Sequence, residues 1–240
     1  DAPPLIELLG TVADDLSEIA DLDGRLHLAA MTTRDLDVNW KLPVDANIET
    51  YHVNTVHRDS AGKILDQTQT GIQLLRNGHS RMLITVRDGT KLTGKQPFPP
   101  VFHGLGDLPD SGTFSFHVFP NLSIVFLGTG FLFLITNWPR PDGGSVYQVH
   151  WCSSLSPTTD DGRAANEMFV GFNQTVLFED LAVLPGMQRS LDAGTLDHLH
   201  LSYQERRIYH LHESIDHAIG PERIDESLRV TPILGPFVED

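Results

Sequence analysis

The feature that most constrains the fold of this chain is a series of six short segments with the composition of β-strands. They are rich in Val, Ile, Phe, Thr and Tyr and cover residues 71–75, 81–86, 113–119, 122–127, 131–138 and 145–153. Turn residues such as Asn77, Gly78, Pro120 and Asn121 separate several of them. Because most of the connections are short, whereas parallel strands need long crossovers, the pattern predicts an antiparallel meander.

Helical patterns follow these segments. Asp160 or Asp161 can cap a helix that covers residues 163–178, and a second helical pattern runs on to Leu191. Pro185 lies inside that run, and we expect it to break or kink the helix. Residues 203–219 predict a final amphipathic helix.

The first part of the chain adds a short amphipathic helix in the acidic opening segment and an extended piece over residues 25–40. Residues 88–110 contain four prolines and little periodicity, and they predict a long surface loop or lid. The sequence therefore predicts an α+β domain, with an antiparallel β-sheet and long C-terminal helices that pack on one face of it.

Residues 39–57 place Glu49, His52 and His57 within nine positions. Pro43 can begin a helix, and residues 45–57 suit an irregular one. At about 100° per residue, Glu49 and His52 share a face of that helix, whereas His57 is turned by roughly 140° from His52. For both imidazoles to reach one metal ion, the helix must loosen or end between them.

A carboxylate from elsewhere would complete a two-histidine, one-carboxylate face, the ligand set of non-haem iron(II) oxygen chemistry. Asp180 is the best candidate, because it lies in a helical pattern with apolar neighbours, where a carboxylate is costly unless it is paired or bound to metal. Glu179 points about 100° away from it, so we expect only Asp180 to face inward. Asn173, Val176 and Leu177 share the helical face of Asp180 and are predicted to line a pocket.

Other histidines compete for a metal role. His198 and His200 are two residues apart, as are His210 and His212, a spacing that can chelate metal from a strand but diverges on a helix. We expect the first pair on a surface loop or strand and the second on two faces of the last helix. Cys152 is expected to be a buried small apolar side chain.

Composition excludes several classes of function. With 17 basic and 32 acidic side chains, the net charge of −15 argues against a nucleic-acid partner. The single cysteine allows no internal disulfide, multi-thiolate zinc site or iron–sulfur cluster within these residues. No segment has the length of a membrane span, and we expect a cytoplasmic protein. The N-terminus has neither an initiator Met nor the pattern of a signal peptide, so a fragment of a longer protein is expected.

These motifs together resemble one known family. Asn39-Trp40-Lys41, the run Glu49-Thr50-Tyr51-His52, His57, and later Glu179-Asp180 with Gln188 are similar to the catalytic domain of Rieske non-haem iron ring-hydroxylating oxygenase α subunits. The resemblance spans most of the chain. It implies a helix-grip (START-like) domain in which His52, His57 and Asp180 bind mononuclear iron(II), and in which Ala46 borders the substrate.

The resemblance also implies partners. Glu49 would bridge, across a subunit boundary, to a histidine ligand of a neighbouring Rieske [2Fe–2S] cluster, and a homotrimer is expected. Electrons would come from NAD(P)H through a reductase or ferredoxin and that cluster. These 240 residues contain neither the C-x-H nor the C-x-x-H ligand motif of a Rieske domain, so we expect a single mononuclear-iron domain over residues 1–240.

The leading hypothesis is therefore an oxygenase that uses O2 to hydroxylate an apolar, aromatic substrate. Two alternatives remain open from the sequence. One is a non-enzymatic helix-grip module that binds an apolar ligand and does not need the three residues to converge. The other is a zinc-dependent hydrolase in which Glu49 serves as a general base.

Overall fold

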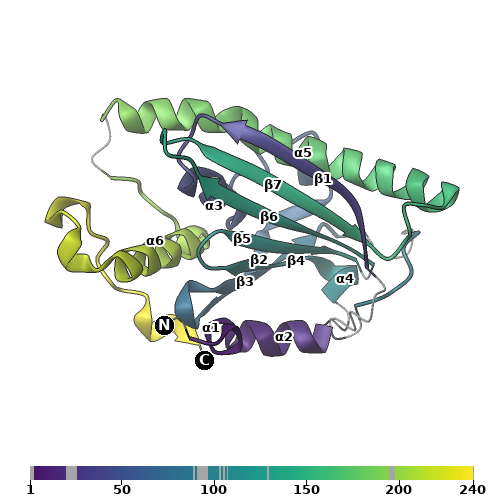
Figure 1. The fold of residues 1–240 in the computed structure, drawn as a ribbon, viewed down its shortest axis with the longest axis horizontal. Helices are drawn as coiled ribbons and strands as arrows, with labels where there is room; N and C mark the ends of the chain where they lie inside the picture. The colour runs from purple at the N-terminus through teal and green to yellow at the C-terminus, as the bar shows by residue number, and fades with distance from the viewer. Residues whose placement is uncertain are drawn as a thin grey trace.

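The computed structural model describes residues 3–19, 26–88, 90, 97–102, 104, 106, 108–128, 130–194 and 198–239. An eight-stranded sheet with the order β1-β7-β6-β5-β4-β3-β2-β8 forms its centre (Figure 1). The strands are β1 (His27–Leu36), β2 (Leu65–Leu75), β3 (Ser80–Val86), β4 (Gly112–Val118), β5 (Leu122–Leu127), β6 (Phe131–Pro139), β7 (Ser145–Ser153) and β8 (Val238–Glu239).

The predicted meander is confirmed. Strands β2 to β7 follow one another as antiparallel neighbours, and β1 pairs antiparallel with β7 at one edge. Only β8 is parallel to its neighbour, β2. The sequence placed β5 and β7 at their observed bounds, whereas β2 begins six residues earlier than predicted, at Leu65.

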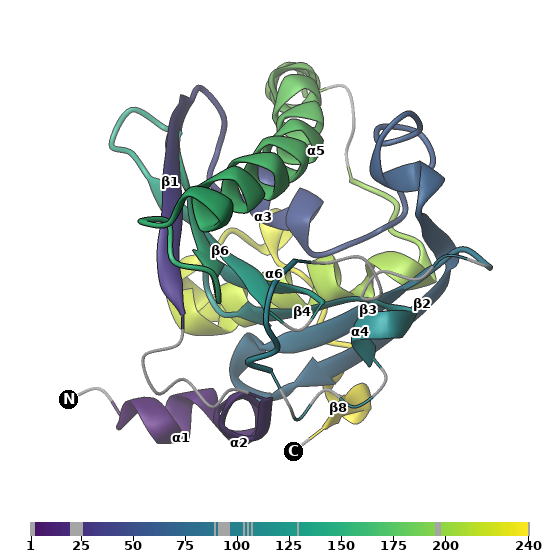
Figure 2. The same ribbon diagram turned by 90° about the vertical axis from the view of Figure 1, so that its right-hand side faces the viewer.

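Helices cover both faces of the curved sheet (Figure 2). The inner face, which carries Phe133, Tyr147 and Trp151, packs against Leu177 of α5 (Asp160–Asp192). On the outer face, Phe116 and Phe126 belong to one buried cluster with Val12 of α2 (Thr11–Ile19). The C-terminal helix α5 packs on one face as expected, and α2, from the opening segment, covers the other face. The strands carry apolar side chains on both faces of the sheet, so other elements must bury each face.

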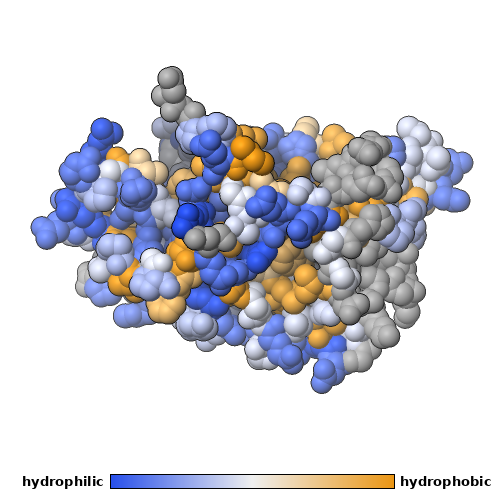
Figure 3. Space-filling view, turned by 90° about the horizontal axis from the view of Figure 1, so that it is seen from below, coloured by the Kyte–Doolittle hydropathy of each residue, from blue (hydrophilic) through white to orange (hydrophobic). Residues whose placement is uncertain are grey.

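The molecular surface on the side of α1 (Leu5–Leu9) and α2 carries both apolar and hydrophilic side chains. Seen from that side, apolar side chains form separate patches among hydrophilic ones (Figure 3). None of the helices that the structure describes combines the length and the apolar character that a membrane span requires.

Of the break or kink predicted at Pro185, the break is wrong, because α5 is continuous through this residue. Contacts on both sides of the proline hold the helix to the rest of the fold. Leu184 is buried against Val38 and Leu42, and the Gln188 side chain accepts a hydrogen bond of 2.8 Å from the backbone N–H of Asn39. This packing offsets the backbone hydrogen bond that proline removes.

The helix predicted at 45–57 is also displaced. Helix α3 covers Lys41–Asn47, so Pro43 lies within its first turn, where a missing N–H costs nothing. Residues 51–60 form consecutive turns. The helix thus ends before both histidines, not between them.

The described parts of residues 88–110 are not a surface loop throughout. Phe98, Val101 and Phe102 are buried, and the last two pack on the outer face of the sheet. The remaining prediction for residues 89, 91–96, 103, 105 and 107 lies outside the described residues. A short helix, α4 (Leu108–Ser111), ends this stretch.

The last helix, α6 (Arg206–Ile219), is confirmed. A short 3-10 helix, Tyr203–Glu205, leads into it, and the Glu205 side chain accepts a hydrogen bond from the backbone N–H of Ser202 at the start of that turn. It lies at the end of the sheet beside α3, where Ile208 and Leu211 share a cluster with Val44 of α3. Together α3, α5 and α6 enclose the inner face of the sheet.

Candidate metal centre

Three predicted ligands converge although they come from distant parts of the chain. His52 and His57 lie in the turns that follow α3, and Asp180 lies on the buried side of α5. The Nε2 atoms of His52 and His57 are 3.1 Å apart, and they lie 3.2 and 2.9 Å from Oδ1 of Asp180. Among the described residues, this is the group whose ligand atoms could hold a metal ion.

These spacings fit one triangular face of an octahedron. Ligand atoms bound at about 2.1 Å stand roughly 3.0 Å apart when they are cis to one another. All three observed separations are close to that value. Two neutral imidazole nitrogens and one carboxylate oxygen are, moreover, the donors that suit a non-haem ferrous ion and leave the opposite face open.

Each imidazole is held from behind by a carboxylate. Nδ1 of His52 contacts Oε1 of Glu49, whose other oxygen accepts a hydrogen bond from the backbone N–H of Tyr51. Nδ1 of His57 lies 2.8 Å from Oε2 of Glu179, which also accepts a hydrogen bond from the Ser60 hydroxyl. Such contacts select the tautomer that presents Nε2 to the metal and fix the plane of each ring.

Glu179 and Ser60 are therefore parts of the site that the sequence did not reveal. Glu179 was expected to point away from the site because it lies about 100° from Asp180 around the helix. The ring of His57 spans this angle, so its two nitrogens meet the two neighbouring carboxylates. The adjacent acid pair was the only signal in the sequence.

The electrostatics of the centre are set by these carboxylates. Burial disfavours the charged form of His52, but Asp180 and Glu49 outweigh it and raise the pKa of His52 to about 10. The pKa of His57 is raised in the same way, against burial, chiefly by Asp180 and then by Glu179. Although burial favours the neutral acid, hydrogen bonds with both histidines lower the pKa of Asp180. The raised pKa values mean that a metal ion must compete with protons for both imidazoles.

The turn that carries the histidines is held by close backbone contacts. The backbone N–H of Gly62 donates a hydrogen bond of 2.8 Å to the carbonyl of His57. A Cβ atom on Gly62 would meet the carbonyl oxygens of His57 and Val53 at 2.8 and 2.9 Å. Nε of Arg87, the residue directly after β3, donates a hydrogen bond to the Gly62 carbonyl. Only glycine allows this approach.

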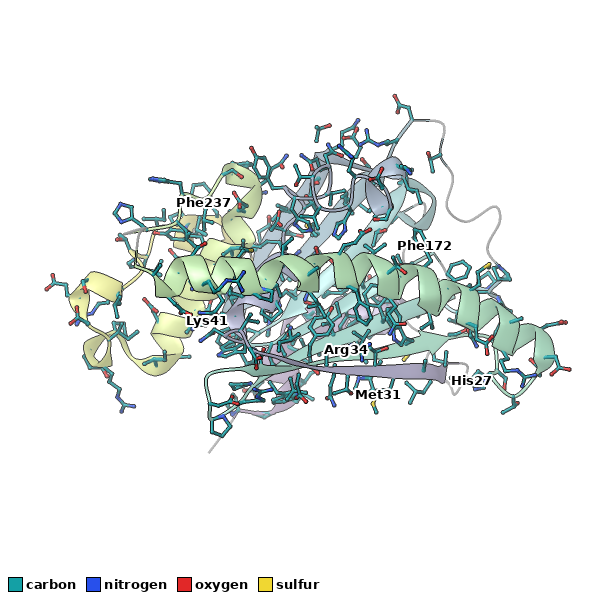
Figure 4. All side chains as sticks on the ribbon, turned by 90° about the horizontal axis from the view of Figure 1, so that it is seen from above. His27, Met31, Arg34, Lys41, Phe172 and Phe237 are labelled. Carbon is teal, nitrogen blue, oxygen red and sulfur yellow. The ribbon has the colours of Figure 1, made fainter. Side chains whose placement is uncertain are left out.

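A cavity of about 360 Å³ lies between α5 and the inner face of the sheet. None of the three ligands is among its described lining residues, but Val176, one turn before Asp180 on α5, is. Phe172 is half exposed at its edge and lies on the side of α5 away from β1, where His27, Met31 and Arg34 are labelled (Figure 4). The described residues that line the cavity are Ala61, Ile64, Leu65, Thr113, Val125, Leu127, Phe133, Phe169, Phe172, Asn173 and Val176.

The predicted pocket residues fall in different places. Asn173 and Val176 line the cavity, whereas Leu177 packs into the core between α5 and the sheet. Ala46 lies on α3 and packs against a cluster with Leu184. Glu49 lies behind His52, and only 8% of its side chain is exposed.

The two other histidine pairs do not join the centre. His198 and His200 lie in an exposed irregular stretch, as expected. On α6, His210 contacts the carbonyl of Leu75, and His212 pairs with Asp45 at 3.2 Å, so the two face different partners. Cys152 is half-buried at the edge of the core on the outer face.

The comparisons with known proteins agree with this geometry. The model of the ring hydroxylating alpha subunit (catalytic domain) matches residues 22–220. The chain therefore belongs to the family of ring-hydroxylating α subunits, of which it matches the catalytic domain. No curated protein matches the sequence closely enough to count as a relative.

Several solved structures share the fold. A quaternary ammonium Rieske monooxygenase, CntA, aligns with a TM-score of 0.62 and 16% identity over 80% of this chain and 48% of its own. Naphthalene 1,2-dioxygenase from Rhodococcus sp. aligns with a TM-score of 0.57 and 19% identity over 79% of this chain and 50% of its own. Dicamba monooxygenase aligns with a TM-score of 0.55 and 13% identity over 82% of this chain and 60% of its own. The chain thus spans about half the length of the first of these relatives.

Proposed function

We propose that residues 1–240 form a mononuclear-iron oxygenase domain that uses O2 to hydroxylate an apolar, aromatic substrate. His52, His57 and Asp180 would hold iron(II), which supplies, when bound, the place where dioxygen is activated. The observation that carries this proposal is the spacing of the three ligand atoms, 2.9 to 3.2 Å, beside an apolar cavity. Membership of the ring-hydroxylating α subunit family supports the choice of iron over other metals.

The protein's own residues would act in two ways. Glu49 and Glu179 keep Nδ1 of each imidazole engaged, so Nε2 of both rings faces the metal. The walls of the cavity, including Val125, Phe133 and Val176, exclude water and bury the substrate next to the centre. Neither role requires a charged group to contact the substrate.

The partners extend the same proposal. Glu49 bonds to a ligand imidazole and is placed to be the bridge through which a Rieske [2Fe–2S] domain passes electrons. That domain, a ferredoxin or reductase, and a homotrimeric assembly are proposed from family membership, as is a cytoplasmic location near NAD(P)H. The sheet curved around a long helix supports the helix-grip class.

The experiment is an anaerobic titration of the metal-free protein with iron(II), followed by addition of nitric oxide. One iron per chain and the electron paramagnetic resonance signal of a ferrous nitrosyl complex would show a ferrous site with an open position. Preference for zinc with no nitrosyl signal would support the hydrolase alternative. Binding of no metal at all would support the non-enzymatic helix-grip module instead.

A further inference from the structure

Two of the described side chains that line the cavity between α5 and the sheet are polar. Asn173 projects from α5, and Thr113 projects from β4 on the opposite wall. The other described lining side chains are aliphatic or phenyl groups, and none of the described ones can ionise. A polar group in such a wall is costly unless it finds a hydrogen-bond partner.

Asn173 uses only part of its hydrogen-bonding capacity. Its Nδ2 donates a hydrogen bond of 2.8 Å to the carbonyl of Phe169, one turn earlier in α5. Within the described part of the chain, Oδ1 of this amide has no partner. The contact with Phe169 restrains the amide, so Oδ1 is left as an unused acceptor on a residue that lines the cavity.

Thr113 offers a complementary group from the sheet. It pairs with Ile84 of β3, and the pairing of Phe114 with Phe126 places it next to Leu127, another lining residue. Its hydroxyl has no hydrogen-bond partner among the residues that the structure describes. A hydroxyl can either donate or accept, so it can serve the same ligand group as Oδ1 of Asn173.

Helix geometry sets the distance from these groups to the metal centre. Asn173 precedes Asp180 by seven residues, which is close to two turns and a rise of roughly 10 Å on one face of α5. Val176, one turn from Asp180, lines the cavity between them. Asn173 is thus separated from the metal ligands by an apolar stretch long enough for a fused two-ring molecule, and the cavity continues beyond it along Phe169 and Phe172.

We infer that Asn173 and Thr113 determine specificity by binding one neutral hydroxyl or N–H group of the substrate. The substrate would be an uncharged, elongated molecule whose apolar end faces His52, His57 and Asp180. A charged group is disfavoured because none of the described lining side chains can compensate it. This inference rests on the proposed function, since it takes the cavity as the substrate site of the iron centre.

The test compares three probes of one shape: naphthalene, 2-naphthol and 2-naphthoate. Their dissociation constants are measured by equilibrium dialysis with the iron-loaded full chain under nitrogen, so that no turnover occurs. One hydrogen bond predicts that 2-naphthol binds roughly 3- to 10-fold more tightly than naphthalene, with 2-naphthoate the weakest. In Asn173→Leu and Thr113→Val, the ratio of naphthol to naphthalene affinity should fall toward one.

Three results would overturn the inference: equal affinities of wild type for naphthalene and 2-naphthol, a ratio that survives in both variants, or tightest binding of 2-naphthoate. If Asn173→Leu does not fold, Thr113→Val carries the test, because valine has the shape of threonine. Iron content is measured in the same samples. Failure to bind iron would contradict the proposed function, whereas intact iron with no discrimination between probes would contradict only the role of Asn173 and Thr113.

Discussion

Glu179 and His57 form the contact that ties the metal centre to α5 beyond the ligand Asp180. Oε2 of Glu179 lies 2.8 Å from Nδ1 of His57, while Nε2 of the same ring lies 2.9 Å from Asp180. The Ser60 hydroxyl donates to the same Glu179 oxygen. One imidazole is thus held at both nitrogens by adjacent residues of one helix, which fixes its direction before any metal binds.

Glu179→Gln tests this contact. The amide keeps the shape of the side chain but removes the charge that raises ligand basicity, so iron(II) affinity should fall by roughly 10- to 100-fold. Affinity is measured by anaerobic titration against a competing chelator. Glu167→Gln, an exposed site on the same helix, should leave affinity unchanged. Equal affinities in the two variants would show that Glu179 does not support the ligand.

Gly62→Ala tests the close backbone approach behind His57. The added methyl would meet two carbonyl oxygens below 3.0 Å, so the turn that carries both histidines must shift. We expect at least a roughly tenfold loss of iron(II) affinity, in the range seen when metal-orienting contacts are lost. Gly71→Ala is the control, because its Cβ would meet nothing within 4 Å. A Gly62→Ala protein with wild-type iron affinity would contradict this account of the turn.

Pro185→Ala tests the cost of proline inside α5. Alanine restores an N–H at an exposed position in the middle of a 33-residue helix, so the free energy of unfolding should rise by about 1–3 kcal/mol. Urea denaturation measures the change. Pro185→Gly should be about 1 kcal/mol less stable than Pro185→Ala, because glycine is a poorer helix former. An unchanged free energy of unfolding in Pro185→Ala would mean that the proline costs the helix no stability.

His117 should make the fold sensitive to acid. Its side chain is buried on β4, and neither ring nitrogen has a partner among the described residues. Burial, reinforced by the positive charge of Arg207, lowers the pKa of His117 well below its usual value. The unfolded chain then binds the extra proton first, so stability is lost as the pH falls below about 6.5, by up to about 1.4 kcal/mol per pH unit.

The corresponding measurement is the free energy of unfolding of wild type and His117→Leu at pH 7 and pH 5. Leucine removes two unpaired buried nitrogens and cannot take up a proton, so the variant should lose less stability on acidification. The other histidines are common to both proteins and cancel in the difference. Parallel loss of stability in the two proteins would exclude His117 as a source of the acid sensitivity.

The sheet could be predicted from the sequence because its information is local. Alternation of apolar residues and turn residues such as Gly78 and Asn121 fixed the order of the strands, and β5 and β7 fall at their expected bounds. Pro185 misled the prediction because the contacts that hold α5 on either side of it, at Leu184 and Gln188, join the helix to residues far away in the chain. The helix propensity of the local sequence does not include such long-range contacts.

The site, too, could be predicted only in part from the sequence. The sequence identified His52, His57 and Asp180 as candidate ligands, and the structure brings their ligand atoms together. It did not reveal Glu179 or Ser60, because their roles depend on the path of the turns after α3. Helix geometry alone could not show that the His57 ring spans two adjacent carboxylates.

The most direct test of the central claim is iron(II) binding by Asp180→Ala beside wild type and the exposed-site control Glu167→Ala. Each protein is titrated anaerobically, and the iron retained after gel filtration is counted. We predict one iron per chain for wild type and Glu167→Ala, and a loss of affinity of more than about 100-fold for Asp180→Ala, since removing a ligand costs more than removing a contact behind one. Equal iron binding by Asp180→Ala and wild type would contradict the assignment of the centre.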